Sequence, residues 1–244
     1  MSTACIIVIG NEILSGRTRD ENLGWLAVEL NKIGVRLLEA RVIPDVPDAI
    51  IKAVNACRKT YDYIFTTGGI GPTHDDITAS CIAQAFGVPY VRNREAEAIL
   101  RKNYGAQNLN EARLKMADMP EGATLIANPV SAAPGFIIGN VYVLAGVPRI
   151  MQAMFDQFKT TLKGGEPMLS ATISVFLTEG IIAEKLTKIQ SDFPDVEIGS
   201  YPFIRSGRLG TSLVSRHTAP ARLEQVTASI SQLIESFGGE IAAD

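Results

Sequence analysis

A glycine-rich stretch that ends in two acidic residues carries the clearest chemical signal in the sequence. Residues 66–76 read TTGGIGPTHDD and follow a short β-branched run. Glycines allow the backbone to approach a ligand closely, and a helix that begins just beyond them presents unpaired N–H groups to a phosphate. Asp75 and Asp76 would then either cap that helix or hold a divalent cation that bridges to phosphate oxygens. An ordinary strand-to-helix turn with acidic capping is the alternative.

The spacing of this stretch excludes two common nucleotide-binding motifs. A Walker A loop needs Gly-Lys-Ser/Thr, and the dinucleotide fingerprint is G-x-G-x-x-G; residues 66–76 contain neither. The sequence therefore argues against P-loop ATP hydrolysis and against ordinary NAD redox chemistry.

Two other segments follow predicted strands and are chemically unusual. In residues 10–22, Glu12 adds a carboxylate, and Ser15 and Asn22 can donate hydrogen bonds. Residues 128–136 (NPVSAAPGF) supply small residues, prolines and a glycine, which shape a cavity with exposed backbone donors. Ligands of open parallel sheets bind outside the carboxyl ends of the strands, so these segments are expected at the same edge. A polar surface loop and a tight turn are the alternative interpretations.

The pattern of strands and helices predicts the domain that positions these loops. Up to about residue 160, β-branched runs alternate with amphipathic segments of helical spacing, which is typical of βαβ units and a mostly parallel sheet. The expected strands are 5–9, 35–43, 63–67, 123–127 and 141–145. The expected helices are 23–33, one from Pro47 that ends before Tyr61, 74–86 and one from about 148, with two solvated helical segments in 93–119. We therefore predict a three-layer α/β/α domain over residues 1–165.

A second, smaller domain is expected after a composition change at 163–167 (KGGEP). The segments beyond it predict a strand, a helix, two strands and a final helix. Their expected ranges are 170–177, 181–190, 196–203, 211–216 and 223–237. The prediction is a small α+β domain of βαββα order over residues 168–244.

Composition limits the classes of function. The chain has 244 residues, 46% of them hydrophobic, which supports a packed core and excludes disorder. The formal net charge of −3 argues against nucleic acid as a partner. No apolar stretch reaches the roughly 18 residues of a membrane span, and the amino terminus lacks the pattern of a signal peptide. We therefore expect a cytoplasmic protein with neither a nucleic-acid nor a membrane partner.

The cysteines and histidines predict no zinc site. Cys5, Cys57 and Cys81 lie in apolar patterns without C-x-x-C spacing, so we expect buried thiols in a reducing compartment. The two histidines, His74 and His217, are too few for a His/Cys metal cluster, and they indicate no charge-relay triad.

Four stretches, in this order, carry a resemblance to a known family. They are GNEILSG at 10–16 with Asn22, TTGGIGPTHDD at 66–76, NPVSAAPGF at 128–136 and AGVPRIM at 145–151. The chain resembles the MoaB/Mog-like molybdopterin-binding superfamily and, within it, the amino-terminal part of the competence/damage-inducible protein CinA. IGSYPF at 198–203 and GTSLVSR at 210–216 are similar to the small domain of that group, so the resemblance covers nearly the whole chain.

The resemblance implies a ligand, a metal and an assembly. The ligand would be a molybdopterin or a nucleotide that is bound through its phosphate. The protein would act in molybdenum cofactor metabolism and would be a homo-oligomer. By matching positions, Asp75 and Asp76 would be catalytic and hold a divalent metal (Mg²⁺, Mn²⁺ or Co²⁺), assisted by Glu12. The ligand-binding residues that the resemblance implies are Thr67, Gly68, Gly69, Gly71, Pro72, Thr73, Ser15, Asn22, Ser131, Pro134 and Gly135.

Three functions stay open at this point. The first is molybdopterin or nucleotide binding, and the second is the metal-dependent hydrolysis of nucleotide pyrophosphates of the ADP-ribose or FAD class, which has been attributed to the CinA group. The third is a non-catalytic interaction domain, because Asn11 stands where many relatives have Asp. Ser131 likewise stands where a glycine is frequent. No deamidase domain is expected within these 244 residues, so nicotinamide-nucleotide deamidation is not assigned.

Overall fold

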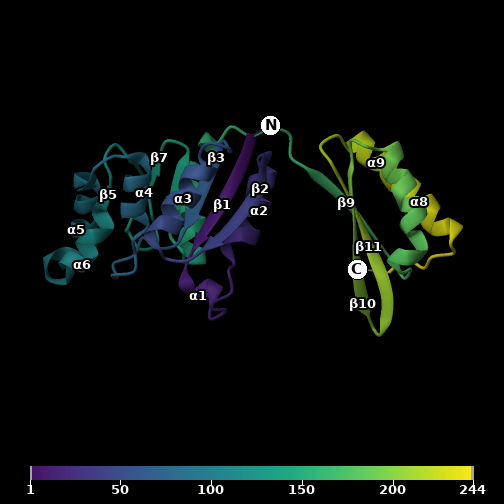
Figure 1. The fold of residues 1–244 in the computed structure, drawn as a ribbon, viewed down its shortest axis with the longest axis horizontal. Coiled ribbons are helices and arrows are strands. Elements are labelled where there is room, and N and C mark those ends of the chain that lie inside the picture. Colours follow the sequence, from purple (N-terminus) through teal and green to yellow (C-terminus); the bar gives the residue numbers. More distant parts are fainter. Residues whose placement is uncertain (1, 243–244) are drawn as a thin grey trace. The chain divides into compact units, whose positions relative to one another are not determined.

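The computed structural model describes residues 2–242 and divides the chain into two compact units. The larger unit is Met1–Gly165 and the smaller is Glu166–Asp244. Figure 1 shows a sheet with helices on both sides in the first unit, and a hairpin-bearing sheet with two helices in the second.

The larger unit is built on a six-stranded sheet with the order β2-β1-β3-β8-β7-β6. Its strands are β1 (Ser2–Ile9), β2 (Val35–Ile43), β3 (Tyr63–Thr67), β6 (Thr124–Ile126), β7 (Gly135–Ile138) and β8 (Val141–Leu144). Strands β2, β1, β3 and β8 are parallel, whereas β7 pairs antiparallel with both β8 and β6. The expected mostly parallel sheet is confirmed, with an antiparallel pairing on one side that the sequence did not predict.

Helices cover both faces of this sheet and produce three layers. Alternate side chains of β1 enter two separate cores. Cys5, Ile7 and Ile9 pack on one face with α3 (Pro47–Cys57) and α4 (Thr78–Phe86). The other β1 side chains pack on the opposite face with α2 (Asn22–Lys32) and α7 (Pro148–Phe158). A parallel strand buried on both faces needs an unbroken apolar run, which residues 4–9 supply.

Residues 90–120 form an excursion from the sheet. Its helical parts are α5 (Arg94–Asn108), α6 (Glu111–Leu114) and the 3-10 turn η1 (Lys115–Ala117). A two-stranded sheet of β4 (Tyr90–Arg92) and β5 (Asp118–Pro120) closes the excursion. The two helical segments were expected, but the short strands were not. A 3-10 turn, η2 (Lys159–Thr161), follows α7 near the end of the unit.

The smaller unit has the predicted βαββα order. It consists of β9 (Leu169–Val175), α8 (Glu179–Asp192), β10 (Glu197–Arg205), β11 (Arg208–His217) and α9 (Pro220–Ser236). Its antiparallel sheet has the order β10-β11-β9. The two helices bury Ile182, Val226 and Ile230 in a core of its own with Val175 and Leu213.

Two predicted boundaries in the larger unit were wrong. The helix expected over 74–86 begins at Thr78, because residues 71–76 form a turn of their own. The segment around Pro134 was expected as a loop, but Gly135 begins strand β7. This strand is only four residues long, so its apolar run is too short to be distinguished from a turn by periodicity.

Candidate functional site

A cavity of about 540 Å³ lies where three strands of the parallel sheet end. Its walls include Ile9 and Gly10 after β1, residues 68–72 after β3, and residues 145–148 after β8. This is the edge at which open parallel sheets bind ligands. The volume falls within the roughly 300–1,000 Å³ of small-molecule sites.

The loop after β3 can adopt its path only because glycines occupy it. Gly68 has a φ of +100°, and a Cβ there would lie 2.2 Å from the carbonyl oxygen of Ile9. Gly69 has a φ of +69°, and its Cβ would meet the Thr78 hydroxyl. That hydroxyl donates a 2.9 Å hydrogen bond to the Gly68 carbonyl, and the Thr78 N–H donates to Gly69. The loop is therefore held against the end of β1 and the start of α4.

The two aspartates after this loop differ in their surroundings. Asp76 Oδ2 accepts hydrogen bonds from the Thr73 N–H at 2.8 Å and from the Thr73 hydroxyl at 2.5 Å. It therefore closes the turn before α4, whose N-cap, Ile77, makes no side-chain capping bond. Asp75, by contrast, is exposed to solvent. The N-cap position of α4 is held by Ile77 and not by either aspartate, so the alternative in which they cap this helix does not hold.

Two further carboxylates reach the cavity from β1 and β2. Glu12 lies in the short helix α1 (Asn11–Leu14), and its carboxylate folds back over Gly10, where an added Cβ would be 2.5 Å away. Asp45 follows β2 and accepts a 2.8 Å hydrogen bond from the Asn11 N–H. Sequence reasoning missed Asp45, although its position two residues after a predicted strand was a usable signal.

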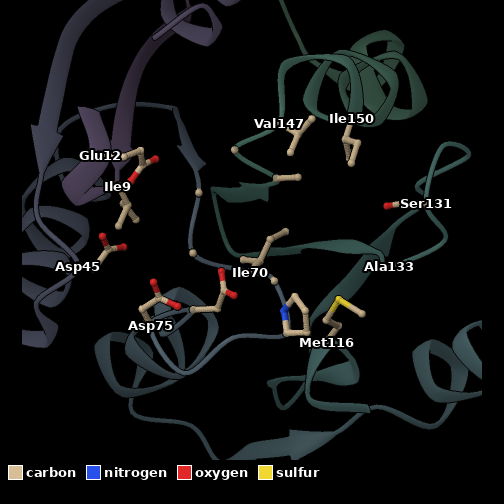
Figure 2. A pocket seen from close by; sticks show the side chains of 18 of the residues that line it. Ile9, Glu12, Asp45, Ile70, Asp75, Met116, Ser131, Ala133, Val147 and Ile150 are labelled. Carbon is tan, nitrogen blue, oxygen red and sulfur yellow. The ribbon is translucent and has the colours of Figure 1, made fainter. Parts of the chain in front are cut away.

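The cavity has an acidic side and an apolar side. Figure 2 shows Glu12, Asp45 and Asp75 along one side, and Val147 and Ile150 on the opposite side. The lining residues that sequence reasoning did not name also include Met116 and Ala133. Met116 lies in η1, within an excursion that the sequence placed away from the strand ends, so no local pattern could have identified it. Ala133 lies within residues 128–136, the segment that the sequence did associate with a cavity.

The carboxylates suit a cation that shares its ligands with a bound molecule. Among the described residues, Cys5, Glu39 and Cys57 are the one set of three potential ligands whose atoms all lie within 4.8 Å. The acids of the cavity are therefore spread too widely to enclose an ion by themselves. Mg²⁺ is commonly held by one or two carboxylates together with substrate phosphates and water. The oxygen donors present fit that arrangement.

A recess of about 60 Å³ adjoins the cavity and shares Ile9, Glu12 and Gly146 with it. The Asn22 Nδ2 group donates a 2.7 Å hydrogen bond to the Gly146 carbonyl. Asn22 Oδ1 and Thr67 Oγ1 are buried and have no hydrogen-bond partner within residues 2–242. Buried polar atoms without partners are rare, so these two atoms indicate a place for water or for a polar group of a ligand.

The structure brings together most of the residues predicted to form the site. Those that line the cavity are Glu12, Gly68, Gly69, Gly71, Pro72, Asp75, Asp76 and Ser131. Asn22 and Thr67 line the adjoining recess instead.

Four predicted residues line neither the cavity nor the adjoining recess. Ser15 is exposed beyond α1, and Thr73 contributes by holding Asp76. Pro134 is buried beside a recess of only about 10 Å³. Gly135 is buried in β7, where an added Cβ would be 2.4 Å from the Val143 carbonyl oxygen. The absence of a Cβ at Gly135 is therefore required by strand packing, and neither Pro134 nor Gly135 is among the residues that line the cavity.

Comparison with known proteins agrees with the division into two units. Residues 5–164 match the family described as "Probable molybdopterin binding domain", and residues 167–238 match the "FAD synthase, middle domain". A protein of Archaeoglobus fulgidus is 39% identical over 81% of this chain and 84% of its own length. A "Probable FAD synthase" of Caenorhabditis elegans is 32% identical over 95% of this chain, which spans 50% of that relative.

A solved structure supports the same relationship. The protein CinA from Thermoplasma acidophilum has a TM-score of 0.62 and is 34% identical, covering 66% of this chain and 97% of its own. The chain belongs to the MoaB/Mog-like family of probable molybdopterin-binding domains, with similarity to the amino-terminal part of CinA.

Proposed function

We propose that the cavity binds a molybdopterin or a nucleotide through its phosphate groups. One observation carries this proposal: the glycine loop (residues 68–72), the acidic side chains and the apolar side chains all line the same cavity. Backbone of the glycine loop would approach the phosphate, because its glycines leave no Cβ in the way. Val147 and Ile150 would pack against the heterocycle. The match of the small unit to a FAD synthase domain supports a nucleotide of the FAD class.

We also propose that the ligand is bound together with a divalent cation, either Mg²⁺, Mn²⁺ or Co²⁺. Four carboxylates line the cavity, and they would repel the phosphates of a ligand unless a cation lay between them. Asp75 and the unbonded oxygen of Asp76 would hold this cation, with Glu12 and Asp45 as further acidic groups. Asn11 supplies no carboxylate, but the neighbouring Asp45 offers one.

Calorimetric titration tests the binding proposal. FAD and ADP-ribose are titrated into the full chain with Mg²⁺ and, separately, with a chelator. We expect saturable binding that weakens at least tenfold on chelation and in Asp75→Asn. The matched control is Asp192→Asn, which changes an exposed carboxylate in the smaller unit. Equal affinity in Asp75→Asn and in the wild-type protein would contradict the assignment of Asp75, and absence of binding to either nucleotide would move the test to molybdopterin.

A second candidate function is hydrolysis of a nucleotide pyrophosphate, which the number of carboxylates at the cavity favours. A bound divalent cation would polarise a phosphoryl oxygen. Glu12 or Asp45 would accept the proton of the attacking water, since both carboxylates face the cavity and lie apart from the glycine loop. The water oxygen would form a bond to one phosphorus while the bridging oxygen leaves with the other phosphate.

Product analysis separates catalysis from binding. The purified protein is incubated with ADP-ribose or FAD across Mg²⁺, Mn²⁺ and Co²⁺, and release of AMP is followed by chromatography. We expect metal-dependent release that is lost in Asp75→Asn and kept in Asp192→Asn. Binding without any AMP release would identify a binding protein, whereas a failure of every ligand to bind would leave a non-catalytic interaction domain.

We propose further that the protein acts as a homo-oligomer in the cytoplasm, without a nucleic-acid or membrane partner. The formal net charge of −3 supports the absence of a nucleic-acid partner. In residues 2–242, none of the helices is long and apolar enough to cross a bilayer. Light scattering during size-exclusion chromatography would give the mass of the assembly, and a mass of one chain would contradict the oligomer.

A further inference from the structure

Two cysteine thiols are in direct contact in the core of the larger unit. Cys5 of β1 and Cys57, the last residue of α3, lie 52 positions apart, and their Sγ atoms are 3.2 Å apart. Both side chains are fully buried between the sheet and α3. A covalent disulfide has an S–S distance of about 2.05 Å, so a movement of roughly 1 Å separates this contact from a bond.

The two thiols are chemically unequal. The Cys5 S–H donates to Cys57 Sγ, and this hydrogen bond is the largest cause that lowers the pKa of Cys57 and raises that of Cys5. The positive charge of Arg41 also lowers the pKa of Cys57. Because a thiolate is the nucleophilic form of cysteine, Cys57 is the attacking sulfur of the pair and Cys5 is the partner that carries the proton.

A charged network beside the pair is placed there by an irregularity in the sheet. The pairing of β1 with β2 shifts register between Ala4 and Cys5, so that Cys5 lies opposite Glu39. The Glu39 carboxylate accepts hydrogen bonds from Arg41 Nε at 2.5 Å and from the Tyr61 hydroxyl at 2.7 Å. A register shift of this kind redirects side chains, and here it brings a charged pair to the edge of an apolar core.

This network argues against a metal ion at the pair. Cys5, Cys57 and Glu39 offer three ligands within 4.8 Å, whereas structural zinc sites have four. Both oxygens of Glu39 already accept hydrogen bonds, and the Arg41 guanidinium would repel a cation. The same positive charge favours a thiolate, so the surroundings suit thiol oxidation better than metal binding.

We propose that Cys5 and Cys57 are a site of reversible oxidation, at which a peroxide converts the two thiols into a disulfide. The Cys57 thiolate attacks one oxygen of hydrogen peroxide, the O–O bond breaks, and hydroxide leaves, giving a sulfenic acid. Cys5 sulfur then attacks the Cys57 sulfur, loses its proton and displaces water. In total, two thiols lose two electrons and two protons, and one peroxide is reduced to two waters. A small oxidant is required because both sulfurs are buried.

The disulfide would join β1 to the carboxyl end of α3. It would close a loop of 52 residues, which restricts the unfolded chain more than the folded one. We therefore expect the oxidised protein to unfold at a temperature higher by about 10 °C. Cys81 is buried in the same core and provides the internal comparison, since burial raises the pKa of its thiol.

Thiol counting on the full chain tests the proposal without any ligand. Reduced protein is incubated with hydrogen peroxide, freed of peroxide, unfolded in an alkylating reagent and weighed by mass spectrometry. We expect three alkylated cysteines in the reduced protein and one, Cys81, in the oxidised protein. Before alkylation, the oxidised protein should weigh about 2 Da less than the reduced protein. Peptide mapping should recover a Cys5–Cys57 link, and a dithiol reductant should restore three thiols and the original unfolding temperature.

Cysteine variants test whether the link joins Cys5 to Cys57 specifically. Cys81→Ala should still form the link, whereas Cys5→Ala should not and should show no rise in unfolding temperature on oxidation. Three free thiols after peroxide treatment, a link that includes Cys81, or sulfinic acid at Cys57 without a link would each overturn the proposal. Saturable uptake of Zn²⁺ that protects both Cys5 and Cys57 from alkylation would overturn it in favour of a metal site.

Discussion

The side-chain amide of Asn22 donates a 2.7 Å hydrogen bond to the carbonyl oxygen of Gly146, a residue 124 positions away. Asn22 begins helix α2 and is buried, while Gly146 follows strand β8 and lines the cavity. The bond defines which way the amide is turned, because only its nitrogen can donate. It therefore ties two edges of the candidate site together and leaves Oδ1 without a partner beside the recess.

We predict that Asn22→Asp destabilises the larger unit more than Asn22→Ala does. The Asn22→Ala variant loses the hydrogen bond to Gly146, which lowers the free energy of unfolding by about 1 kcal/mol. Aspartate at neutral pH places a second acceptor against the Gly146 carbonyl and buries a charge, so its cost should exceed that of alanine by about 1 to 3 kcal/mol. Urea unfolding followed by circular dichroism measures both. Equal stability of the two variants would show that the amide nitrogen is not bonded to Gly146.

Gly68→Ala should destabilise the protein far more than Gly16→Ala. Both glycines have positive φ, which costs alanine about 1 to 2 kcal/mol. A Cβ at Gly16 meets nothing within 4 Å, but one at Gly68 would be 2.2 Å from the Ile9 carbonyl oxygen. We expect at least 2 kcal/mol of additional cost at Gly68, because a collision with backbone cannot be relieved by a side-chain rotation. Denaturant titration of the two variants provides the comparison.

Substitutions of Asp76 and Asp75 should distinguish an effect on stability from an effect on ligand binding. Asp76→Ala removes the acceptor of two bonds from Thr73 and should lower the unfolding free energy by about 1 kcal/mol. Asp75→Ala should change stability by less than about 0.5 kcal/mol, because its side chain is exposed. Both variants should lose metal-dependent ligand affinity in calorimetry. A fully stable Asp76→Ala protein would mean that Asp76 does not hold the turn.

The smaller unit should lose stability in acid through Asp195. The Arg222 guanidinium, at 2.5 Å, lowers the pKa of this carboxyl to about 2, whereas an unfolded aspartate titrates at about 3.9. A lowered pKa means that the stabilisation is complete above the unfolded value and is lost as the pH falls from about 4 to about 2. Thermal melts between pH 2 and pH 6 should show a smaller decline for Asp195→Asn than for the wild-type protein. The unfolding temperature of the control variant Asp192→Asn, which changes an exposed carboxylate nearby in the sequence, should fall with pH as much as that of the wild type.

Local sequence patterns determined most of the elements and the main motif. Strand 35–43 was predicted with the bounds that the structure has, and the helix after it with the correct start at Pro47, because β-branched runs and a proline at the first helical turn act within a few residues. The glycine loop was recognised because its residues lie together in the sequence. The tendency of ligands to bind at the carboxyl ends of parallel strands likewise places Glu12 and Asp75 at one edge from the sequence alone.

Tertiary structure alone decided which residues meet across long separations. Asp45 joins the cavity because β2 is the neighbour of β1 in the sheet, and Met116 joins it because an excursion returns past the glycine loop. Strand β7 exists because β6 and β8 pair with its backbone, so an apolar run of four residues, too short for periodicity to assign, becomes a strand. The contact of Cys5 with Cys57 depends on α3 packing against β1. Each of these contacts is stabilised by burial between distant segments, which local periodicity does not encode.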